Sequence, residues 1–502
     1  MSAAAPAAAT VPSRRRHPHR HRRWRGSTRC PASASPSTPA RSESDDPSTT
    51  ARVNERRIKL VEFYAGMGTM RWSLERALES DAGAVVTALA SIDNSEVANA
   101  VYLANYPHED ASGVLMRRNV EHLSSVPSLD AKFGGADVWT LSPPCQPFTR
   151  QGHRKDKDDG RSQSFLRLLE EILPKLRDPP SHVLVENVVG FERSETRHTA
   201  VRTLHDLGYD TREFMCSPRM FGVPYSRPRY FLLAKRKTIG WADGDWDDGD
   251  EYPARNEGPK VWESRLHQCQ PPSRLSATKE WVPAGVKCVY PRDFEGDTKA
   301  EYEFRQIKHG AAPEPDPSLP TYGYPVALMG VFLGYGSTGL MCHGDDASQL
   351  FSTYAVPEKD VRVGLGAVDV VCATSYKCNC FTKSYGKYVK GTGSMVTDRL
   401  VNKETWDGRV AVAGGTGDDD DGAPRLRYFT EREIAKIHSF PSDFSFPEHI
   451  TRAQRYALLG NSLSVACVAP LIDHLLNDPS VPGEQPPPRR TVVALTSDDV
   501  TK

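Results

Sequence analysis

Short apolar runs alternate with helix-periodic segments through the first half of the chain. Four runs have the length of a buried strand, at residues 58–63, 85–92, 138–141 and 183–185. Three segments carry apolar positions at helical spacing, at residues 70–78, 165–176 and 199–207. Residues 225–233 alternate and then become apolar, which predicts another strand entering the sheet. This order predicts an α/β fold on a largely parallel sheet.

Composition divides the chain into five expected parts. Residues 1–55 and 478–502 are polar and rich in Pro, so they cannot bury enough apolar surface and should be disordered. Residues 56–240 carry the alternating pattern and should form the main domain. Residues 241–424 are richer in Asp, Gly and Pro and should form a smaller domain, and residues 425–477 should return to the main one. Within that last part, Thr430 and Glu433 have the spacing of a helix capping box.

The 502 residues carry equal numbers of basic and acidic side chains, 64 of each, so only local charge can indicate a nucleic-acid partner. Seven arginines between residues 14 and 25 are typical of a nuclear-import signal, an RNA-binding arm or an organelle transit peptide, or belong to a solvated tail. The ten cysteines form no dense framework, which favours a reducing compartment. No apolar run approaches the roughly 20 residues of a membrane span, so we expect a protein of the cytoplasm or nucleus. We also expect a monomer.

Residues 142–148 read SPPCQPF and directly follow an apolar run. The prolines exclude helix and restrict the backbone, so Cys145 should stand on a rigid turn at a strand's C-terminal end. A lone cysteine is more often structural, but the prolines favour a functional one. No Cys-x-x-Cys partner lies nearby, so a nucleophile is better supported than a zinc ligand or a redox centre. Glu186 supplies a carboxylate at a second strand end.

The first apolar run leads into a glycine-rich turn, Ala65-Gly66-Met67-Gly68, and then a helix. Strand, turn and helix together are typical of a nucleotide-type site, although the third glycine of the dinucleotide fingerprint is missing. Asp93 ends the second apolar run, where a carboxylate can accept hydrogen bonds from a ribose. The alternative is that Asp93 caps the helix beginning near Ser95.

The stretch CNCFTKSYGKYVKGTGS, residues 378–394, lies between acidic loops at 243–251 and 418–421. Basic residues interleaved with aromatics are typical of surfaces that contact phosphates and stack on bases. The candidate substrate-binding residues are Lys383, Tyr385, Lys387 and Lys390. The alternative is an internal brace of the small domain. One residue between Cys378 and Cys380 is too few for a usual zinc knuckle, and we expect no metal site.

SPPCQPF combined with Glu186-Asn187-Val188 resembles the cytosine-5 methyltransferases, which methylate carbon 5 of cytosine in DNA or RNA. The CFTKSYG stretch with its TGS continuation, SPPCQPFTRQG and the RYALLGNSL run are similar to the DNA methyltransferase 2 type, which acts on position 38 of tRNA-Asp. The arginine-rich extension, the acidic inserts and the long tail depart from that small enzyme. A DNA methyltransferase and a catalytically silent RNA-binding protein are the two rival functions.

The resemblance implies a Rossmann-like domain dependent on S-adenosylmethionine, with a small target-recognition domain. It implies that Cys145 adds to carbon 6 of cytosine while Glu186 stabilises a proton on ring nitrogen 3. Arg227 and Arg229 would hold the base and its phosphate. Cofactor contacts are implied for Phe63, Gly66, Met67, Gly68, Thr69, Asp93, Asn119, Val120, Ser142, Asn461 and Ser462.

Overall fold

The chain divides into two compact units, Met1–Arg52 and Val53–Lys502. A computed structural model describes only residues of the second unit: 56–79, 81, 83–125, 129–144, 160–221, 223–241, 288–289, 326–327, 329–334, 345–364, 367–375, 377–399, 401, 408, 410 and 423–477. The two termini expected to be disordered, the arginine cluster and the acidic loops therefore lie outside the described residues.

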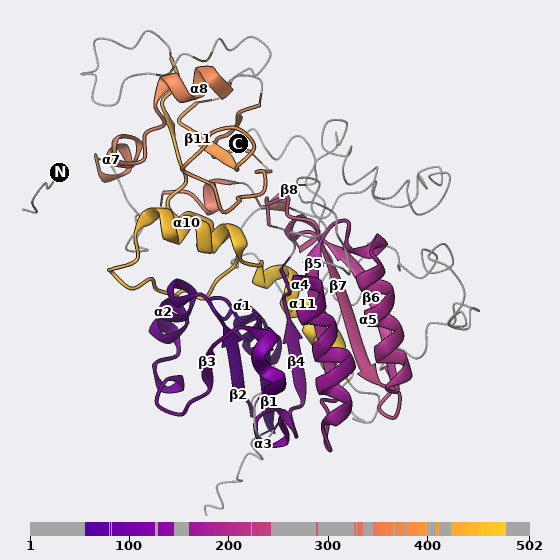
Figure 1. Cartoon of the computed structure of the whole chain (residues 1–502). Helices are drawn as coiled ribbons and strands as arrows, with labels where there is room; N and C mark the ends of the chain where they lie inside the picture. The colour runs from indigo at the N-terminus through magenta and orange to yellow at the C-terminus, as the bar shows by residue number, and fades with distance from the viewer. Residues whose placement is uncertain are drawn as a thin grey trace, which may run out of the picture. The chain divides into compact units, whose positions relative to one another are not determined.

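A seven-stranded sheet in the order β3-β2-β1-β4-β5-β7-β6 forms the centre of the main domain (Figure 1). Its strands are β1 Arg56–Phe63, β2 Ala84–Asp93, β3 Leu115–Arg117, β4 Val138–Leu141, β5 His182–Val188, β6 Tyr209–Cys216 and β7 Arg229–Arg236. The five strands from β3 to β5 pair in parallel, and β7 runs antiparallel to both β5 and β6. The α/β prediction is confirmed, and the carboxyl ends of β2, β1, β4 and β5 meet at one edge.

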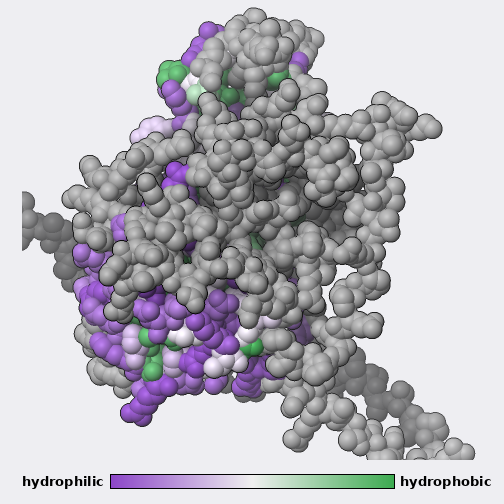
Figure 2. All heavy atoms as spheres, turned by 90° about the vertical axis from the view of Figure 1, so that its right-hand side faces the viewer, coloured by the Kyte–Doolittle hydropathy of each residue, from purple (hydrophilic) through white to green (hydrophobic). Residues whose placement is uncertain are grey.

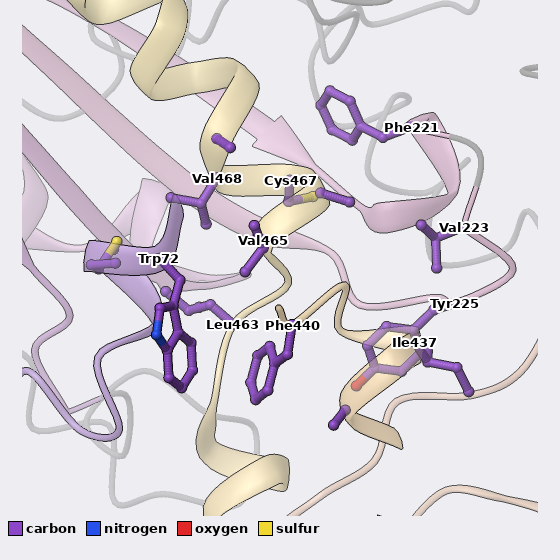
Figure 3. Packing of buried hydrophobic residues seen from close by; sticks show 14 of the residues in the cluster. Trp72, Phe221, Val223, Tyr225, Ile437, Phe440, Leu463, Val465, Cys467 and Val468 are labelled. Atoms are coloured by element: carbon purple, nitrogen blue, oxygen red, sulfur yellow. The ribbon is translucent and has the colours of Figure 1, made fainter. Parts of the chain in front are cut away.

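Helices cover both faces of this sheet: α1 Thr69–Leu78, α2 Glu96–Asn105, α3 Leu129–Phe133, α4 Gly160–Arg167, α5 Glu195–Asp206 and α11 Val465–Leu476. Successive strand residues point to opposite faces, so Leu60 packs in the cluster with α1 and α11, while Val61 packs in the cluster with α4 and α5. Figure 3 shows Trp72 of α1 close to Phe440 and Leu463, and the Trp72 and Phe440 ring centroids are 5.0 Å apart. The C-terminal part therefore completes the main domain's core.

Two predicted helices differ in detail from the sequence pattern. The helix expected at residues 165–176 is α4, followed by a π-helical turn, Leu168–Ile172, and a 3-10 turn, Leu173–Lys175. Pro174, which has no N–H to donate, lies in the first positions of that 3-10 turn, after the α-helical pattern has already ended. The helix expected from residue 199 begins at Glu195, where the Ser194 side chain accepts a hydrogen bond from the Arg197 N–H. Gly208, with φ +83°, ends that helix as predicted.

The small domain holds a three-stranded sheet in the order β10-β11-β12. Its elements are β10 Asp369–Val371, β11 Ser394–Thr397, β12 Leu426–Arg427, α7 Asp345–Thr353 and α8 Glu358–Gly364, and a separate pair joins β8 Cys288–Val289 to β9 Val326–Ala327. β12 pairs with β11, although it lies beyond the boundary predicted at residue 424. The helices α9 Glu431–Ile437 and α10 Arg452–Asn461 follow, and the Thr430–Glu433 capping box is confirmed.

One stretch, Arg452–Leu476, has the length and composition of a membrane span, with a mean hydropathy of 1.3 over its most apolar window, contrary to expectation. The structure divides it at Ser462 into α10 and α11, and 72% of that window is buried inside the protein. A core helix passes the same test of length and composition.

Figure 2 shows mostly polar residues on the described part of one face, with small scattered apolar areas. The exposed large apolar side chains among the described residues are Val85, Val189, Val363 and Tyr388. Isolated exposed apolar residues are ordinary on protein surfaces, so these four residues do not by themselves indicate a binding site.

Candidate active site

Several of the predicted catalytic and cofactor residues that the structure describes lie around the sheet edge formed by the carboxyl ends of β2, β1, β4 and β5. Asp93 ends β2, Ser142 follows β4, and Glu186 lies near the end of β5. The Ser142 N–H donates to the Phe63 carbonyl at 3.3 Å, which ties the end of β4 to the end of β1. Cys145 lies outside the described residues, which stop at Pro144 and resume at residue 160. Its role as nucleophile therefore stays a prediction.

The glycine turn has a conformation that other residues rarely adopt. Gly66 and Gly68 have φ +56° and +92°, and a Cβ on Gly68 would lie 3.1 Å from the Tyr106 ring and 3.2 Å from the Tyr102 ring. Gly68 precedes α1, whose N-terminus receives no capping bond from the Gly68 position. Backbone N–H groups at a helix start are suited to binding an anionic or polar ligand.

Asp93 braces this turn. Its carboxylate accepts hydrogen bonds from the Gly66 N–H at 2.9 Å and the Ser95 N–H at 2.8 Å. The helix-cap alternative for Asp93 is wrong, because the Ser95 side chain accepts the bond from the Ala98 N–H and caps α2. Burial raises the pKa of Asp93, while these backbone donors act in the opposite direction. Its proposed contact with a ribose stays a prediction.

The last sequence motif reaches the glycine turn. The Thr69 and Ser462 hydroxyls are 2.6 Å apart and buried, although 393 positions separate them in the chain. Beside Ser462, Gly460 packs so closely on the Thr382–Lys383 backbone that a Cβ would lie 2.2 Å from the Thr382 carbonyl carbon. This helix end therefore contacts both the glycine turn and the small domain. Across the turn, the buried Ser142 Oγ has no hydrogen-bond partner among the described residues, as expected of an atom that receives a ligand.

Other predicted cofactor residues lie near the turn with different environments. The Phe63 ring is a core residue, with its centroid 4.8 Å from that of Trp139, and Met67 is buried as well. Asn119 is exposed and accepts a hydrogen bond from the Asn94 amide, whereas Val120 is buried. Asn461 is exposed at the end of α10.

Glu186 is buried beside two arginines. Its Oε1 lies 3.4 Å from Nε of Arg229, the first residue of β7. Burial raises the pKa of Glu186, and the positive charges of Arg229 and then Arg227 oppose that rise. Since burial dominates, the carboxyl group holds a proton at higher pH than an exposed glutamate. Such a group suits proton donation to a ring nitrogen.

The structure corrects the expected position of Arg227. The strand expected at residues 225–233 begins only at Arg229, and Arg227 is buried before it. The Arg227 guanidinium donates to Cys380 Sγ at 3.0 Å, the Phe381 carbonyl at 3.1 Å, the Gly460 carbonyl at 3.0 Å and the Ser462 carbonyl. Both terminal nitrogens of Arg227 therefore donate hydrogen bonds within the protein. Arg229 is the better candidate for contact with a base.

Tyr385 is not the exposed aromatic that the sequence suggested. It is 2% exposed, donates to the Ser394 carbonyl at 2.7 Å and accepts from the Phe429 N–H at 2.9 Å, so it braces the small domain internally. Tyr388 is the exposed ring instead, at 57%, with Lys387 Nζ 5.4 Å from its centroid. Lys383, Lys387 and Lys390 are exposed as expected. Gly393 could have indicated that Tyr385 is buried, because the chain packs closely there: a Cβ on Gly393 would lie 2.8 Å from the Tyr385 ring.

Sequence reasoning also missed a buried polar network behind the glycine turn. Glu62 accepts hydrogen bonds from Ser91 at 2.8 Å and Tyr102 at 2.9 Å, and burial raises its pKa. Arg71 donates to Tyr102 at 3.2 Å and forms an ion pair with Glu109 at 2.6 Å. The network fixes the Tyr102 ring on which Gly68 packs. The position of Glu62 inside the apolar run 58–63 could have indicated a buried carboxylate with polar partners.

Comparison with known proteins is consistent with this arrangement. The model of the family described as C-5 cytosine-specific DNA methylase matches residues 58–281 and 361–477. The tRNA (cytosine(38)-C(5))-methyltransferases of Bos taurus and Homo sapiens are 32% and 31% identical, over 83% of this chain and 98% of each relative. The crystal structure of S. pombe Dnmt2 methyltransferase aligns with a TM-score of 0.55 at 25% identity, over 84% of this chain and 98% of that one. The chain therefore belongs to the C-5 cytosine-specific methylase family.

Proposed function

We propose that this protein transfers a methyl group from S-adenosylmethionine to carbon 5 of cytosine in tRNA, at position 38 of the anticodon loop of tRNA-Asp. The observation that carries the proposal is the shared sheet edge. There the glycine turn after β1, braced by Asp93, and Glu186 of β5, with its partner Arg229, lie on either side of β4. The tRNA substrate rests on relatives that match nearly their full length.

The residues of the turn fit S-adenosylmethionine. The start of α1 offers backbone N–H donors, and Ser142 offers a hydroxyl without a partner among the described residues. Asp93 offers a carboxylate for ribose hydroxyls. When bound, the cofactor supplies an electrophilic methyl group. The protein's part is to hold that group against carbon 5 and to exclude water.

Carbon 5 of cytosine needs activation before it can accept a methyl group. In the proposed reaction the Cys145 thiolate forms a bond to carbon 6 while Glu186 places a proton on nitrogen 3, so the ring's electrons move to carbon 5. Carbon 5 then takes the methyl group, its hydrogen leaves as a proton to a base, and the C6–S bond breaks to release the thiolate. Arg229, 3.4 Å from Glu186, would keep that carboxyl group oriented and contact the base.

The exposed Lys383, Lys387, Tyr388 and Lys390 support an RNA substrate, because cations around an exposed ring can contact phosphates and stack on an unpaired base. Single-stranded loops also present a base for flipping at lower cost than a duplex does.

DNA is the second candidate substrate. The DNA (cytosine-5)-methyltransferase of Dictyostelium discoideum is 30% identical over 84% of this chain and 94% of that protein. The chemistry on the base is the same for both substrates, so only a direct comparison separates them.

Incubation with methyl-labelled S-adenosylmethionine and either tRNA-Asp or duplex DNA tests the proposal. We expect label in tRNA-Asp, none when cytosine 38 is replaced by uridine, and none with Glu186→Gln. Preferential labelling of DNA would overturn the substrate assignment. Label transfer to neither substrate would instead favour a silent RNA-binding protein.

A further inference from the structure

A second cluster of polar side chains lies behind Arg227. Tyr225 and His438 are both completely buried, with stacked rings whose centroids are 5.0 Å apart. The Tyr225 hydroxyl lies 3.0 Å from His438 Nε2 and 3.3 Å from an Arg227 terminal nitrogen. Cys380 Sγ lies 4.0 Å from the same hydroxyl and 3.0 Å from the same nitrogen. The four side chains therefore form one hydrogen-bonded group.

Three separate segments contribute to this group. Tyr225 and Arg227 precede β7, Cys380 belongs to the small domain, and His438 is the C-cap of α9. Figure 3 shows Tyr225 beside Ile437, the residue before His438. The Tyr225 backbone also bridges to Cys378, so the segment before β7 is attached to the small domain on both sides of Cys380.

The Tyr225 hydroxyl proton has two candidate acceptors in this group. Burial and the positive charges of Arg227 and Arg229 hold the pKa of His438 well below its ordinary value, so the imidazole is neutral. Arg227 can only donate, so the Tyr225 oxygen accepts from it. The single Tyr225 proton then goes either to His438 Nε2 or, if that nitrogen is protonated, to Cys380 Sγ. In both arrangements the hydroxyl is fixed among the same three groups.

We propose that Tyr225 and His438 are positioning residues for methyl transfer, whose hydrogen bond holds Cys380 and the Arg227 guanidinium in place. Arg227 lies two residues before Arg229, the partner of Glu186. Arg227 links this group to the Gly460 and Ser462 carbonyls, and Ser462 reaches Thr69 at the glycine turn. The pair thereby sets the distance between the carboxyl group and the turn that is proposed to hold the methyl donor. This inference rests on the proposed methyltransferase function.

Tyr225→Phe removes one hydroxyl group and keeps the ring. We expect the single-turnover methyl-transfer rate with tRNA-Asp to fall about three- to tenfold, as for one lost hydrogen bond, with the dissociation constants of S-adenosylmethionine and tRNA unchanged. His438→Leu should lower the rate by no more than Tyr225→Phe does, because the hydroxyl also contacts Arg227 and Cys380. His438→Gln, whose amide can replace Nε2, should restore the rate. Tyr209→Phe is the matched control, because that buried hydroxyl bonds to the Pro180 carbonyl away from the site and should leave the rate unchanged.

The double variant Tyr225→Phe/His438→Leu separates positioning from general damage. If His438 acts through its hydrogen bond to Tyr225, the rate of the double variant should be no lower than that of Tyr225→Phe alone. Additive losses, a Tyr225→Phe rate equal to wild type, or equal losses in Tyr209→Phe would overturn the proposal. The unfolding free energies of the wild type, the two single variants and the double variant measure the coupling between Tyr225 and His438 without an activity assay. If the wild type methylates neither substrate, the proposed function is rejected, and the coupling between the two residues can still be measured.

Discussion

At the scale of single residues, the site depends on groups whose environment departs from the ordinary. Gly68 has a left-handed backbone with two tyrosine rings against it, Glu186 is a buried carboxyl group, and Ser142 Oγ lacks a partner among the described residues. The departures at Gly68 and Glu186 each give a testable prediction.

Gly68→Ala should weaken S-adenosylmethionine binding. Alanine at φ +92° costs about 1–2 kcal/mol, and its Cβ would press on the Tyr102 and Tyr106 rings that shape the turn. Gly113→Ala is the matched control, since Gly113 has φ +68° but no atom within 4 Å of a new Cβ. Calorimetric titration and urea unfolding should show both variants destabilised and only Gly68→Ala impaired in binding. Equal cofactor affinities in the two variants would argue against the turn as the cofactor site.

The buried Glu186 should make stability depend on pH. Its folded pKa lies above the ordinary value of 4.5, so between 4.5 and the raised pKa the folded state binds more protons than the unfolded state. Stability contributed by Glu186 therefore falls as pH rises through that window. Urea unfolding of wild type and Glu186→Gln at a series of pH values should show the wild type losing stability relative to the variant as pH rises. A difference independent of pH, or one of opposite sign, would contradict the raised pKa.

At the scale of elements, sequence periodicity predicted most of the main domain and failed where short or interrupted segments were decided by tertiary contacts. β3 was missed because it has only three residues, ending in Arg117, and is held by pairing with β2. β7 begins after Pro228 because a central strand cannot accommodate a residue without an N–H. The predicted strand ends placed Asp93, Ser142 and Glu186 at one edge, as found.

Residue roles within the 378–394 segment were harder to predict. Tyr385 and Tyr388 have similar sequence surroundings, yet Tyr385 is buried against Phe381, Tyr428 and Tyr456, and Tyr388 is exposed. Which ring faces inward depends on contacts with α10 and the chain near β12, far away in sequence. The local composition predicted an exposed basic and aromatic segment, but it could not predict that Tyr388 rather than Tyr385 is the exposed ring.

The two tyrosines should therefore have opposite roles. Tyr388→Ala should weaken tRNA binding with little loss of stability, since base stacking on an exposed aromatic contributes about 1–3 kcal/mol. Tyr385→Ala should destabilise the fold by about 3–5 kcal/mol, as expected for a buried aromatic.

The double variant Lys383→Ala/Lys387→Ala should flatten the salt dependence of tRNA binding, with Lys359→Ala, at another exposed lysine, as the control. Wild-type affinity and salt slope in the Tyr388 and lysine variants would place the RNA-binding surface elsewhere.

At the scale of the whole molecule, a chain with 64 basic and 64 acidic residues has to hold a polyanion through a local surface. Cys380 lies three residues before Lys383 and contacts Arg227 of the main domain. The proposed substrate surface is therefore connected to the proposed catalytic edge through side chains rather than through a flexible linker.

The most direct test of the central claim is covalent trapping on tRNA. A tRNA-Asp carrying 5-fluorocytosine at position 38 cannot lose the substituent on carbon 5, so an adduct with Cys145 should persist after methyl transfer. On a denaturing gel, wild-type protein with S-adenosylmethionine should form a slow-migrating complex, and Cys145→Ala should form none. A complex that persists in Cys145→Ala, or one formed with 5-fluorocytosine duplex DNA but not with the tRNA, would contradict the account.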